Sequence, residues 1–185
     1  NEDAFTVVDG RARSRGVLAA VADGMGGAAA GEIASHVAVT VLEAAFVDGE
    51  DDRDVHELLR DAMASANESV LAEAEGNATL TGMGTTCTAA VVLEGELYLA
   101  HVGDSRAYLV RDGAIECLTR DHTLATELQR YATDGVALEG HHILTRCLGA
   151  EHAVEADVLP APLPLEPGDV LLLCSDGLTN VLEDA

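Results

Sequence analysis

Residues 85–118 read TTCTAAVVLEGELYLAHVGDSRAYLVRDGAIECL, and their pattern is the strongest indication of how this chain folds. Apolar and polar side chains alternate with a period of two, which predicts four successive strands at 85–93, 96–102, 106–110 and 114–118. The turns between them are Glu94-Gly95, Gly103-Asp104-Ser105 and Asp112-Gly113. Links this short make neighbouring strands antiparallel.

A buried strand followed by a glycine-rich elbow is predicted near the N-terminus. Residues 16–22, GVLAAVA, form an unbroken apolar run, which is typical of a strand buried on both faces. Asp23-Gly24 is expected to close this strand as a turn, and Met25-Gly26-Gly27 follows as the elbow.

Two core-facing helices are predicted between the elbow and the four strands. Apolar residues recur every four positions over residues 31–46, and a longer apolar stripe marks residues 54–75. The second helix begins with the capping pattern Asp54-x-x-Glu57 and stops at Gly76. Helices followed by antiparallel strands predict the α+β class.

The C-terminal part of the chain predicts shorter elements. A short helix over residues 122–132 leads into an irregular stretch that ends near Ile143. A proline-rich loop then precedes the apolar strand 170–174, and a last helix begins near Leu178. Because no repeat and no linker interrupts residues 1–185, we expect one domain.

The composition excludes several classes of function. The chain has 10 basic residues, all of them arginine, and 33 acidic residues, so its formal net charge is 10 minus 33, or -23. Without lysine it has no phosphate-binding GxxxxGK[ST] loop, no protein-kinase ATP-site lysine and no lysine Schiff base. The negative charge cannot neutralise the phosphates of a nucleic acid, and an aromatic content of 3% offers few side chains for base stacking. Nucleic-acid binding is therefore not expected.

We expect a cytoplasmic protein that does not contact membranes. No apolar run approaches the roughly 18 residues that a membrane span needs. Asn1-Glu2-Asp3 does not look like the start of a signal peptide. The four cysteines are far apart and form no CxxC pair, which indicates reduced thiols. The acidic, lysine-free composition predicts a halophilic protein, because a salt-rich cytoplasm screens its charge repulsion.

Three aspartates follow strongly apolar strands and are candidate metal ligands. Asp23 follows VLAAVA, Asp104 follows LYLAHVG and Asp176 follows VLLLCS. A carboxylate at the end of a core strand is costly unless it is paired, and ten arginines leave few counter-charges. Bound cations would resolve this cost, and oxygen ligands favour Mg²⁺ or Mn²⁺. The motif DGMGG at 23–27 also offers an exposed backbone carbonyl at Gly24 as a ligand, and its glycines let the backbone come close to an ion.

Seven motifs occur in the order seen in a known enzyme family. They are NED at 1–3, VADGMGG at 21–27, GTT at 84–86, HVGDSRAYL at 101–109, TRDH at 119–122, LTRCLG at 144–149 and LLCSDGLT at 172–179. Over the whole chain they resemble the metal-dependent Ser/Thr protein phosphatases of the protein phosphatase 2C family, in its bacterial form. The resemblance implies a four-layer αββα sandwich, in which helices flank two antiparallel sheets and metal ions bind at one edge of the sheets.

The resemblance also implies roles for particular residues. Asp23 matches the carboxylate that bridges two ions, Gly24 the carbonyl ligand and Asp176 a ligand of the second ion. Asp104 matches a carboxylate that helps hold a third, weaker ion in bacterial members. The family uses no protein nucleophile; a water between the ions attacks phosphorus in line, and the metals neutralise the developing charge.

The two ends of the chain and its middle differ from the family pattern. Glu2 and Asp3 match acidic residues near the cluster that act partly through bound water, but the phosphate-binding arginine of the family lies before them. The final metal-ligand aspartate lies beyond position 185, so we expect a domain trimmed at both ends. Met25 stands where animal-type members have a histidine that protonates the leaving group.

The substrate-binding part of the site is expected next to the irregular stretch. Residues 123–142 match the mobile flap that gives these enzymes their substrate preference, and the flap is short here. His122, beside Asp121 at the foot of this stretch, is a candidate for substrate contact.

We therefore expect an enzyme that hydrolyses phospho-Ser/Thr in proteins with two or three Mg²⁺ or Mn²⁺ ions. Its partners would be a phosphoprotein substrate and, in signalling, a Ser/Thr kinase or the targets of that kinase. Two alternatives stay open. One is a non-catalytic relative that serves as a regulatory or binding module; the other is a salt-adapted domain whose acidic turns bind hydrated cations without selectivity.

Overall fold

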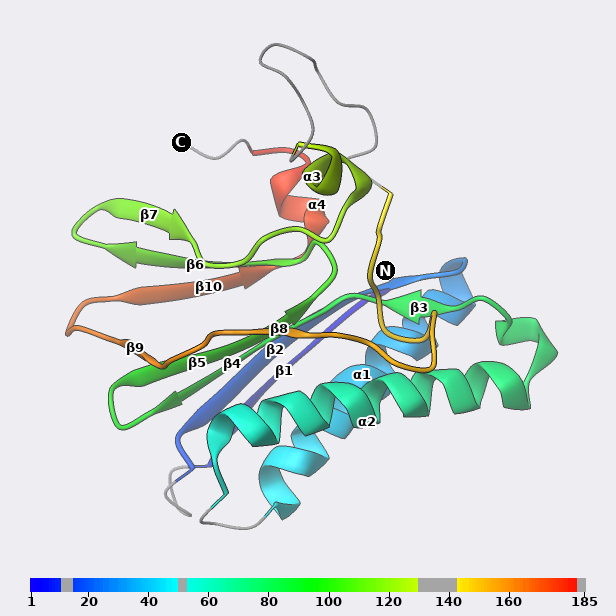
Figure 1. The fold of residues 1–185 in the computed structure, drawn as a ribbon, viewed down its shortest axis with the longest axis horizontal. Helices are drawn as coiled ribbons and strands as arrows, with labels where there is room; N and C mark the ends of the chain where they lie inside the picture. The colour runs from blue at the N-terminus through cyan, green and yellow to red at the C-terminus, as the bar shows by residue number, and fades with distance from the viewer. Residues whose placement is uncertain (11–14, 50–52, 130–142, 183–185) are drawn as a thin grey trace.

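The structure, a computed structural model, describes residues 1–10, 15–49, 53–129 and 143–182. Two antiparallel sheets lie face to face, and a pair of long helices packs on the outer face of the larger sheet (Figure 1). Within these described ranges, no long helix covers the outer face of the smaller sheet. The predicted α+β class with two antiparallel sheets is confirmed.

The larger sheet contains seven strands. Its main path follows the order β1 (Asp3–Asp9), β2 (Val17–Met25), β4 (Cys87–Leu93), β5 (Glu96–Val102) and β8 (Asp157–Val158). Two short strands extend it, because β3 (Gly84–Thr85) pairs with β2 and β9 (Leu163–Pro164) pairs with β5. The smaller sheet has the order β10 (Val170–Cys174), β6 (Arg106–Arg111) and β7 (Ala114–Cys117).

The four strands predicted over residues 85–118 do not form one continuous meander. β4 and β5 pair in the larger sheet through the Glu94-Gly95 turn, and β6 and β7 pair in the smaller sheet through Asp112-Gly113. All four turn residues have positive φ, as tight hairpins require. The other edge of β5 is occupied by β8 and β9, so β6 cannot pair there. The Gly103-Asp104-Ser105 link instead carries the chain from one sheet to the other.

Strand β2 is longer than predicted, and β1 has no counterpart among the predicted strands. β2 continues through Asp23-Gly24 instead of ending there in a turn, because its last two residues pair with β3. β1 pairs along the other edge of β2. Its apolar residues point to both faces, with Phe5 80% exposed, so its sequence carries no clear amphipathic pattern.

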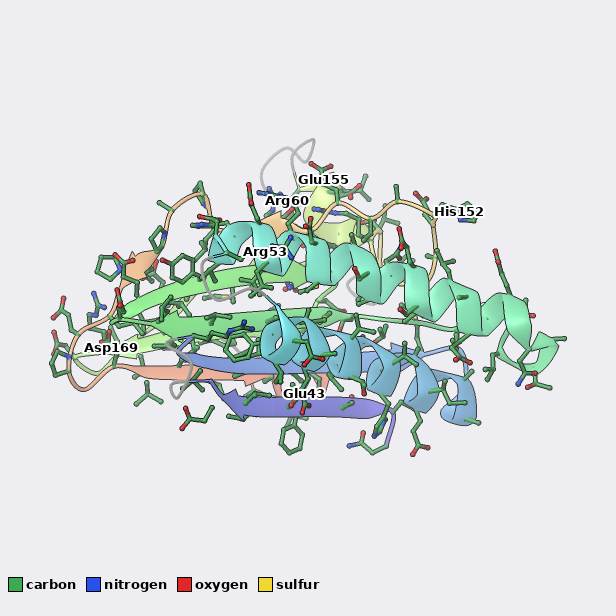
Figure 2. The ribbon with its side chains drawn as sticks, turned by 90° about the horizontal axis from the view of Figure 1, so that it is seen from below. Glu43, Arg53, Arg60, His152, Glu155 and Asp169 are labelled. Atoms are coloured by element: carbon green, nitrogen blue, oxygen red, sulfur yellow. The ribbon has the colours of Figure 1, made fainter. Side chains whose placement is uncertain are left out.

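Helices α1 (Ala28–Asp48) and α2 (Val55–Gly76) lie side by side on the larger sheet (Figure 2). α1 begins slightly earlier than predicted, directly after Gly27, whose φ of 93° ends the elbow. α2 begins as predicted, because the side chain of Asp54 accepts a hydrogen bond from the backbone N of Glu57 at 3.1 Å. A 3₁₀ turn, η2 (Ala78–Leu80), follows α2.

An aliphatic core fills the space between the two helices and the larger sheet. Its members include Leu18, Leu42, Leu59, Met63 and Val91, each at most 2% exposed. A second apolar cluster, between the two sheets, contains Ala90, Leu97, Leu99 and Ala107. Apolar clusters therefore cover both faces of β4 and β5, and burial of this apolar surface stabilises the position of these two central strands.

Helix α1 corrects the expectation that no segment is apolar enough for a membrane. By length and composition alone, residues Ala29–Asp48 could cross one. In the structure this helix packs on β1, β2 and α2. The core helix of a soluble protein has the same length and composition.

Two short helices lie near one end of both sheets (Figure 1). α3 (Leu124–Leu128) is capped by the side chain of Thr123, so His122 precedes the helix instead of beginning it. α4 (Asp176–Thr179) begins earlier than the predicted last helix. Residues 130–132 of the predicted helix lie outside the described residues.

Candidate metal centre and active site

Three of the predicted metal ligands converge at one end of the sheets. Asp23 lies near the end of β2, Asp104 in the link between β5 and β6, and Asp176 at the first position of α4. The carboxyl groups of Asp3, Asp176 and Asp104 all lie close enough to Asp23 for their charges to act on it. The structure thus brings together carboxylates from distant parts of the sequence.

Burial and mutual repulsion raise the pKa values of these carboxyl groups. Desolvation is the largest cause for Asp23, followed by the charges of Asp3 and Asp176, and its pKa rises to about 7. The pKa of Asp104 rises to about 6, mainly through desolvation and then through the charge of Asp176. Such a cluster is unfavourable when every member is ionised, and a bound cation removes the repulsion.

The N-terminal segment places Glu2 and Asp3 beside the cluster. Asp3 pairs with Asp23 across β1 and β2, and its Oδ2 atom accepts a hydrogen bond from Ser175 Oγ at 3.2 Å. The carbonyl oxygen of Glu2 accepts a hydrogen bond from the backbone N of Gly24 at 3.1 Å. These contacts connect the start of the chain to β2 and to the residue before Asp176.

Close packing between β2 and α1 requires glycine at two positions. A Cβ atom at Gly24 would overlap the carbonyl group of Gly31 in α1. A Cβ atom at Gly31 would overlap a carboxylate oxygen of Glu2. The two glycines therefore let the strand and the helix cross at the candidate site, with the Glu2 side chain beside them.

A network of hydroxyl groups holds the backbone of Asp23 and joins it to the Asp104 link. The backbone N of Asp23 donates to Thr86 Oγ1 at 2.9 Å, and Thr85 Oγ1 donates to the carbonyl oxygen of Asp23 at 3.0 Å. Thr86 Oγ1 also forms a hydrogen bond with Ser105 Oγ at 2.7 Å. Because Ser105 follows Asp104 directly, the network fixes the two loops that carry the carboxylates relative to each other.

Sequence reasoning gives these hydroxyl residues no individual role. Thr85, Thr86 and Ser105 belong to the motifs GTT and HVGDSRAYL, and all three are at most 2% exposed. The sequence did contain a signal for this role, because Thr85, Thr86 and Ser105 lie at the ends of predicted core strands and Ser105 directly follows the candidate ligand Asp104. Buried hydroxyls need hydrogen-bond partners, which the backbone of such loops can supply.

His122 supports the Asp104 link from inside the protein. Its side chain is 2% exposed, and Nδ1 accepts a hydrogen bond from the backbone N of Gly103 at 3.0 Å. Since Nδ1 accepts, Nε2 carries the proton and donates to Asp157 Oδ2 at 3.1 Å. Both ring nitrogens are therefore engaged within the protein. Contact of His122 with substrate stays a prediction that this geometry does not support.

The donor atoms of the cluster fit a hard divalent cation. All its side chains offer oxygen, which Mg²⁺ and Mn²⁺ prefer. Among the residues that the structure describes, no three His, Cys, Asp or Glu side chains already surround one ion position. Mg²⁺ keeps several waters and uses one or two carboxylates directly. Asp23, Asp104 and Asp176 are the candidates for direct or water-mediated ligation, with Asp3 and Glu2 beside them.

The structure describes Met25 and the first part of the predicted flap. Met25, at the position of the animal-type histidine, is the last residue of β2 and is partly buried. Residues 123–129 of the predicted flap contain α3, whereas residues 130–142 lie outside the described residues.

Sequence comparison finds relatives along the whole chain. The protein phosphatase 2C family matches residues 1–185. The serine/threonine phosphatase stp of Listeria innocua is 37% identical over 192 residues, which cover 100% of this chain and 75% of that protein.

Solved structures of similar proteins share the fold. The serine/threonine phosphatase of S. agalactiae has a TM-score of 0.87 and 32% identity, covering 100% of this chain and 76% of that chain. The catalytic domain of the phosphatase PstP, in complex with 2 manganese ions, has a TM-score of 0.81 and 37% identity, covering 100% and 74%. This chain therefore belongs to the protein phosphatase 2C family and is a bacterial-type member of these Ser/Thr phosphatases.

Proposed function

We propose that this protein removes phosphate from phosphorylated serine and threonine residues of proteins, in a reaction that depends on divalent metal ions. The observation that carries the proposal is the convergence of Asp23, Asp104 and Asp176, with the pKa of Asp23 raised to about 7. Membership of the protein phosphatase 2C family supports it independently.

Each residue of the cluster has a role in this proposal. Asp23 would be the central metal ligand, since it lies close to Asp176 and is exposed to the charge of Asp104. Asp176 and the carbonyl of Gly24 would complete the main site, and Asp104 would serve a weaker one. Divalent ions, when bound, supply an activated water for attack on phosphorus and neutralise the developing charge. Thr86 holds the backbone of Asp23, so the ligand needs little reorganisation.

We propose Mn²⁺ or Mg²⁺ as the cofactor, with two ions at the main site. The oxygen-only donor set supports either ion. The PstP catalytic domain was solved with 2 manganese ions, which makes Mn²⁺ the first choice for experiments. A third ion near Asp104 is part of the proposal, because Asp104 lies in the link between β5 and β6 with its carboxyl group within reach of the charge of Asp176.

The cellular setting is proposed from composition. A phosphoprotein is the expected substrate, and a Ser/Thr kinase with its targets would be the signalling partner. The net charge of -23 and the absence of lysine support a salt-rich cytoplasm, where the Debye length falls to about 3 Å at 1 M salt. Calorimetry can test this, because equal thermal stability in dilute buffer and in molar KCl would contradict the proposal.

Phosphate release from a phosphothreonine peptide tests the proposed activity. We expect release with MnCl₂, none with EDTA, and a loss of at least about 100-fold in Asp23→Asn and Asp176→Asn. Asp61→Asn is the matched control, because its side chain is 62% exposed on α2. Activity that survives both EDTA and the two substitutions would refute the mechanism. A wild type that binds Mn²⁺ without hydrolysis would favour the regulatory or binding module.

A further inference from the structure

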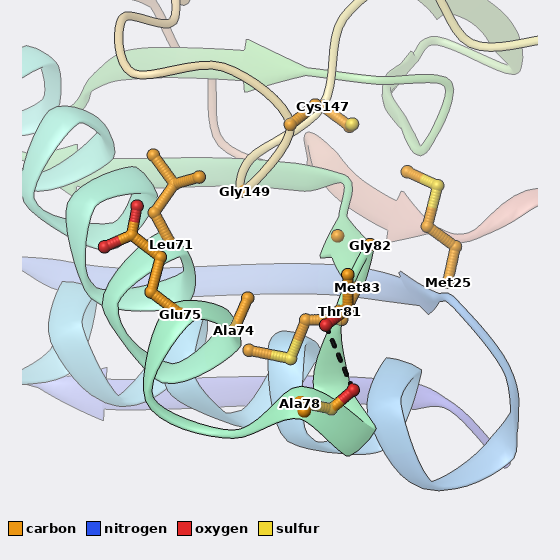
Figure 3. A pocket seen from close by; sticks show the side chains of 12 residues that line it. Met25, Leu71, Ala74, Glu75, Ala78, Thr81, Gly82, Met83, Cys147 and Gly149 are labelled. Carbon is orange, nitrogen blue, oxygen red and sulfur yellow. Dashed lines mark hydrogen bonds between the residues drawn. The ribbon is translucent and has the colours of Figure 1, made fainter.

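A pocket of about 660 Å³ opens at the end of β2, where Met25 lies two residues beyond the candidate ligand Asp23 (Figure 3). It lies between the C-terminal half of α2, residues 78–84 and residues 147–150. Its apolar and sulfur-bearing lining includes Met25, Leu71, Ala74, Met83, Cys147 and Ala150. The proposed hydrolysis of phosphate uses none of these side chains, so the pocket needs a separate explanation.

The pocket shares a wall with the strand that carries Asp23. Asp23 and Met25 project from the same face of β2, because they are two residues apart, and the strand rise separates them by about 7 Å. A Cβ atom at Gly84, which pairs with Met25, would lie 3.4 Å from both Met25 Cε and Cys147 Sγ. Met25 and Cys147 therefore lie on either side of Gly84 at the pocket, and Met25 connects the pocket to Asp23 along β2.

Hydrogen bonds hold the pocket at a fixed distance from Asp23. The backbone N of Thr85 donates to the carbonyl of Leu148 at 3.0 Å, and the N of Leu148 donates to the carbonyl of Thr85 at 2.8 Å. Thr85 Oγ1 also donates to the carbonyl of Asp23. On the other side, the N of Gly149 donates to the buried side chain of Asn67 in α2 at 2.8 Å. The pocket is thus formed before substrate binds.

We propose that this pocket receives an apolar side chain of the phosphoprotein substrate, two residues from the phosphorylated residue. The proposal rests on the proposed phosphatase function. In an extended peptide, side chains two residues apart lie on the same face and about 7 Å apart. This spacing matches that of Asp23 and Met25, so a phosphorylated residue held at the metal centre places such a side chain over the rim.

The lining favours an apolar side chain over a basic one. Leucine, isoleucine or methionine would bury its surface against Met25, Leu71 and Ala74, which are partly exposed, and this burial contributes about 25 cal/mol for each Å² removed from water. Glu75 is the charged residue of the lining, and it is exposed to solvent. An ion pair at an exposed position contributes little, so Glu75 gives a lysine or arginine only a small advantage.

Phosphothreonine peptides that differ at one position test the proposal. Peptides with Leu, Ser or Lys at the second residue before or after phosphothreonine are compared by kcat/KM in MnCl₂. We expect the Leu peptide to exceed the Ser peptide about tenfold at one of these two positions. Hydrolysis of p-nitrophenyl phosphate, which has no neighbouring residues, normalises each preparation. Equal kcat/KM for the Leu and Ser peptides at both positions would overturn the proposal.

Two substitutions on α2 locate the effect. Ala74→Leu narrows the pocket and should bring the ratio of Leu-peptide to Ser-peptide kcat/KM close to one. Ala72→Leu makes the same change on the exposed face of the same helix and should leave the ratio at its wild-type value. Circular dichroism shows whether both variants fold. An Ala74→Leu variant that keeps the wild-type ratio would overturn the proposal.

The remaining outcomes separate this proposal from the proposed function. A preference for the Lys peptide that disappears in Glu75→Gln would overturn the apolar assignment. If neither the peptides nor p-nitrophenyl phosphate is hydrolysed, the proposed function fails. Fluorescence anisotropy with the same labelled peptides and MnCl₂ then tests the pocket by itself. Tighter binding of the Leu peptide would support it, and equal binding would overturn it.

Discussion

Asp3 and Asp23 lie directly opposite each other on the antiparallel strands β1 and β2. Like charges at paired positions destabilise a sheet. The charge of Asp3 is the largest cause, after desolvation, of the raised pKa of Asp23. The protein therefore keeps a pair of residues that costs stability when no cation lies between them, and this cost leads to predictions for the metal-free state.

Asp23→Asn should stabilise the metal-free protein at pH 8 while it abolishes Mn²⁺-dependent activity. Because the pKa of Asp23 is raised to about 7 in the folded state, its ionisation at pH 8 opposes folding. The amide removes this repulsion, and we expect a Tm higher by about 2–4 °C in EDTA, which corresponds to about 1 kcal/mol. Differential scanning calorimetry measures the shift. A variant less stable than wild type under these conditions would contradict a repulsive cluster.

Stabilisation by Mn²⁺ should grow as pH rises from 5 to 8. The pKa values of Asp104 and Asp23 are raised to about 6 and about 7, so both carboxyl groups bind a proton more tightly in the folded state than in the unfolded state. These protons stabilise the metal-free fold at low pH, and the contribution is lost as pH rises through the two values. Protons also compete with the metal for the same carboxylates. The Tm shift caused by MnCl₂ should therefore be larger at pH 8 than at pH 5. An equal shift at both pH values would argue against ligation by these residues.

Thr86→Val should loosen the cluster without changing its charges. The valine leaves the backbone N of Asp23 and the hydroxyl of Ser105 without their shared partner, which costs about 1–3 kcal/mol in a buried site. Thr86→Ser keeps the hydroxyl and is the matched control. Urea denaturation measures stability, and calorimetric titration with MnCl₂ should show weaker binding for valine alone. Equal values for the two variants would exclude a role for the hydroxyl.

His101→Gln should change how stability depends on acid. Burial, and then the charge of His122, lower the pKa of His101 to about 4. Since the pKa of His101 in the folded state lies below the unfolded value of 6.5, the contribution of this neutral histidine to stability is fully present above pH 6.5. That contribution is lost as pH falls toward 4. Relative to the variant, the wild type should lose about 3 kcal/mol over this range.

The comparison of wild type with His101→Gln isolates this histidine. The carboxylates at the cluster titrate in the same range with the opposite sign, but they are present in both proteins and cancel in the difference. Urea denaturation at pH 7, 5.5 and 4 gives the difference directly. A difference in unfolding free energy that does not vary with pH would contradict the prediction.

Gly24→Ala should destabilise the protein strongly. Its Cβ atom would overlap the carbonyl group of Gly31, and backbone atoms on both elements leave no flexible side chain to move aside. We expect a loss of more than about 2 kcal/mol by urea denaturation. Gly76→Ala is the control, because a Cβ atom there meets nothing within 4 Å and should stabilise α2 by about 0.5–1 kcal/mol. Similar effects at both positions would contradict the close crossing.

Much of the fold could be predicted because its signals are local. The helical period and the cap at Asp54 identified α2, and the Glu94-Gly95 and Asp112-Gly113 turns identified two hairpins. Three carboxylates after apolar strands predict the candidate metal centre, since ionised groups at the ends of buried strands need counter-charges, and the structure places these three near one another. These features depend on residues that are close in the sequence.

The rest could not be predicted because it depends on contacts between distant segments. β8 and β9 each contain two residues, too few to show a period, yet they occupy the edge of β5 and send β6 to the other sheet. β1 is recognised as a strand only by its pairing with β2. The partner of Thr86 is likewise set by the arrival of Ser105 from another loop. Local sequence patterns do not specify these contacts between distant segments.

The candidate metal centre draws its carboxylates from both sheets. Asp3 and Asp23 stand on the larger sheet, Asp176 follows the last strand of the smaller one, and Asp104 lies where the chain passes between them. Cations bound there would fasten one end of the sandwich, and their removal would let like charges push the sheets apart. Loss of the proposed divalent ions would then leave the protein more open to proteolysis as well as stopping turnover.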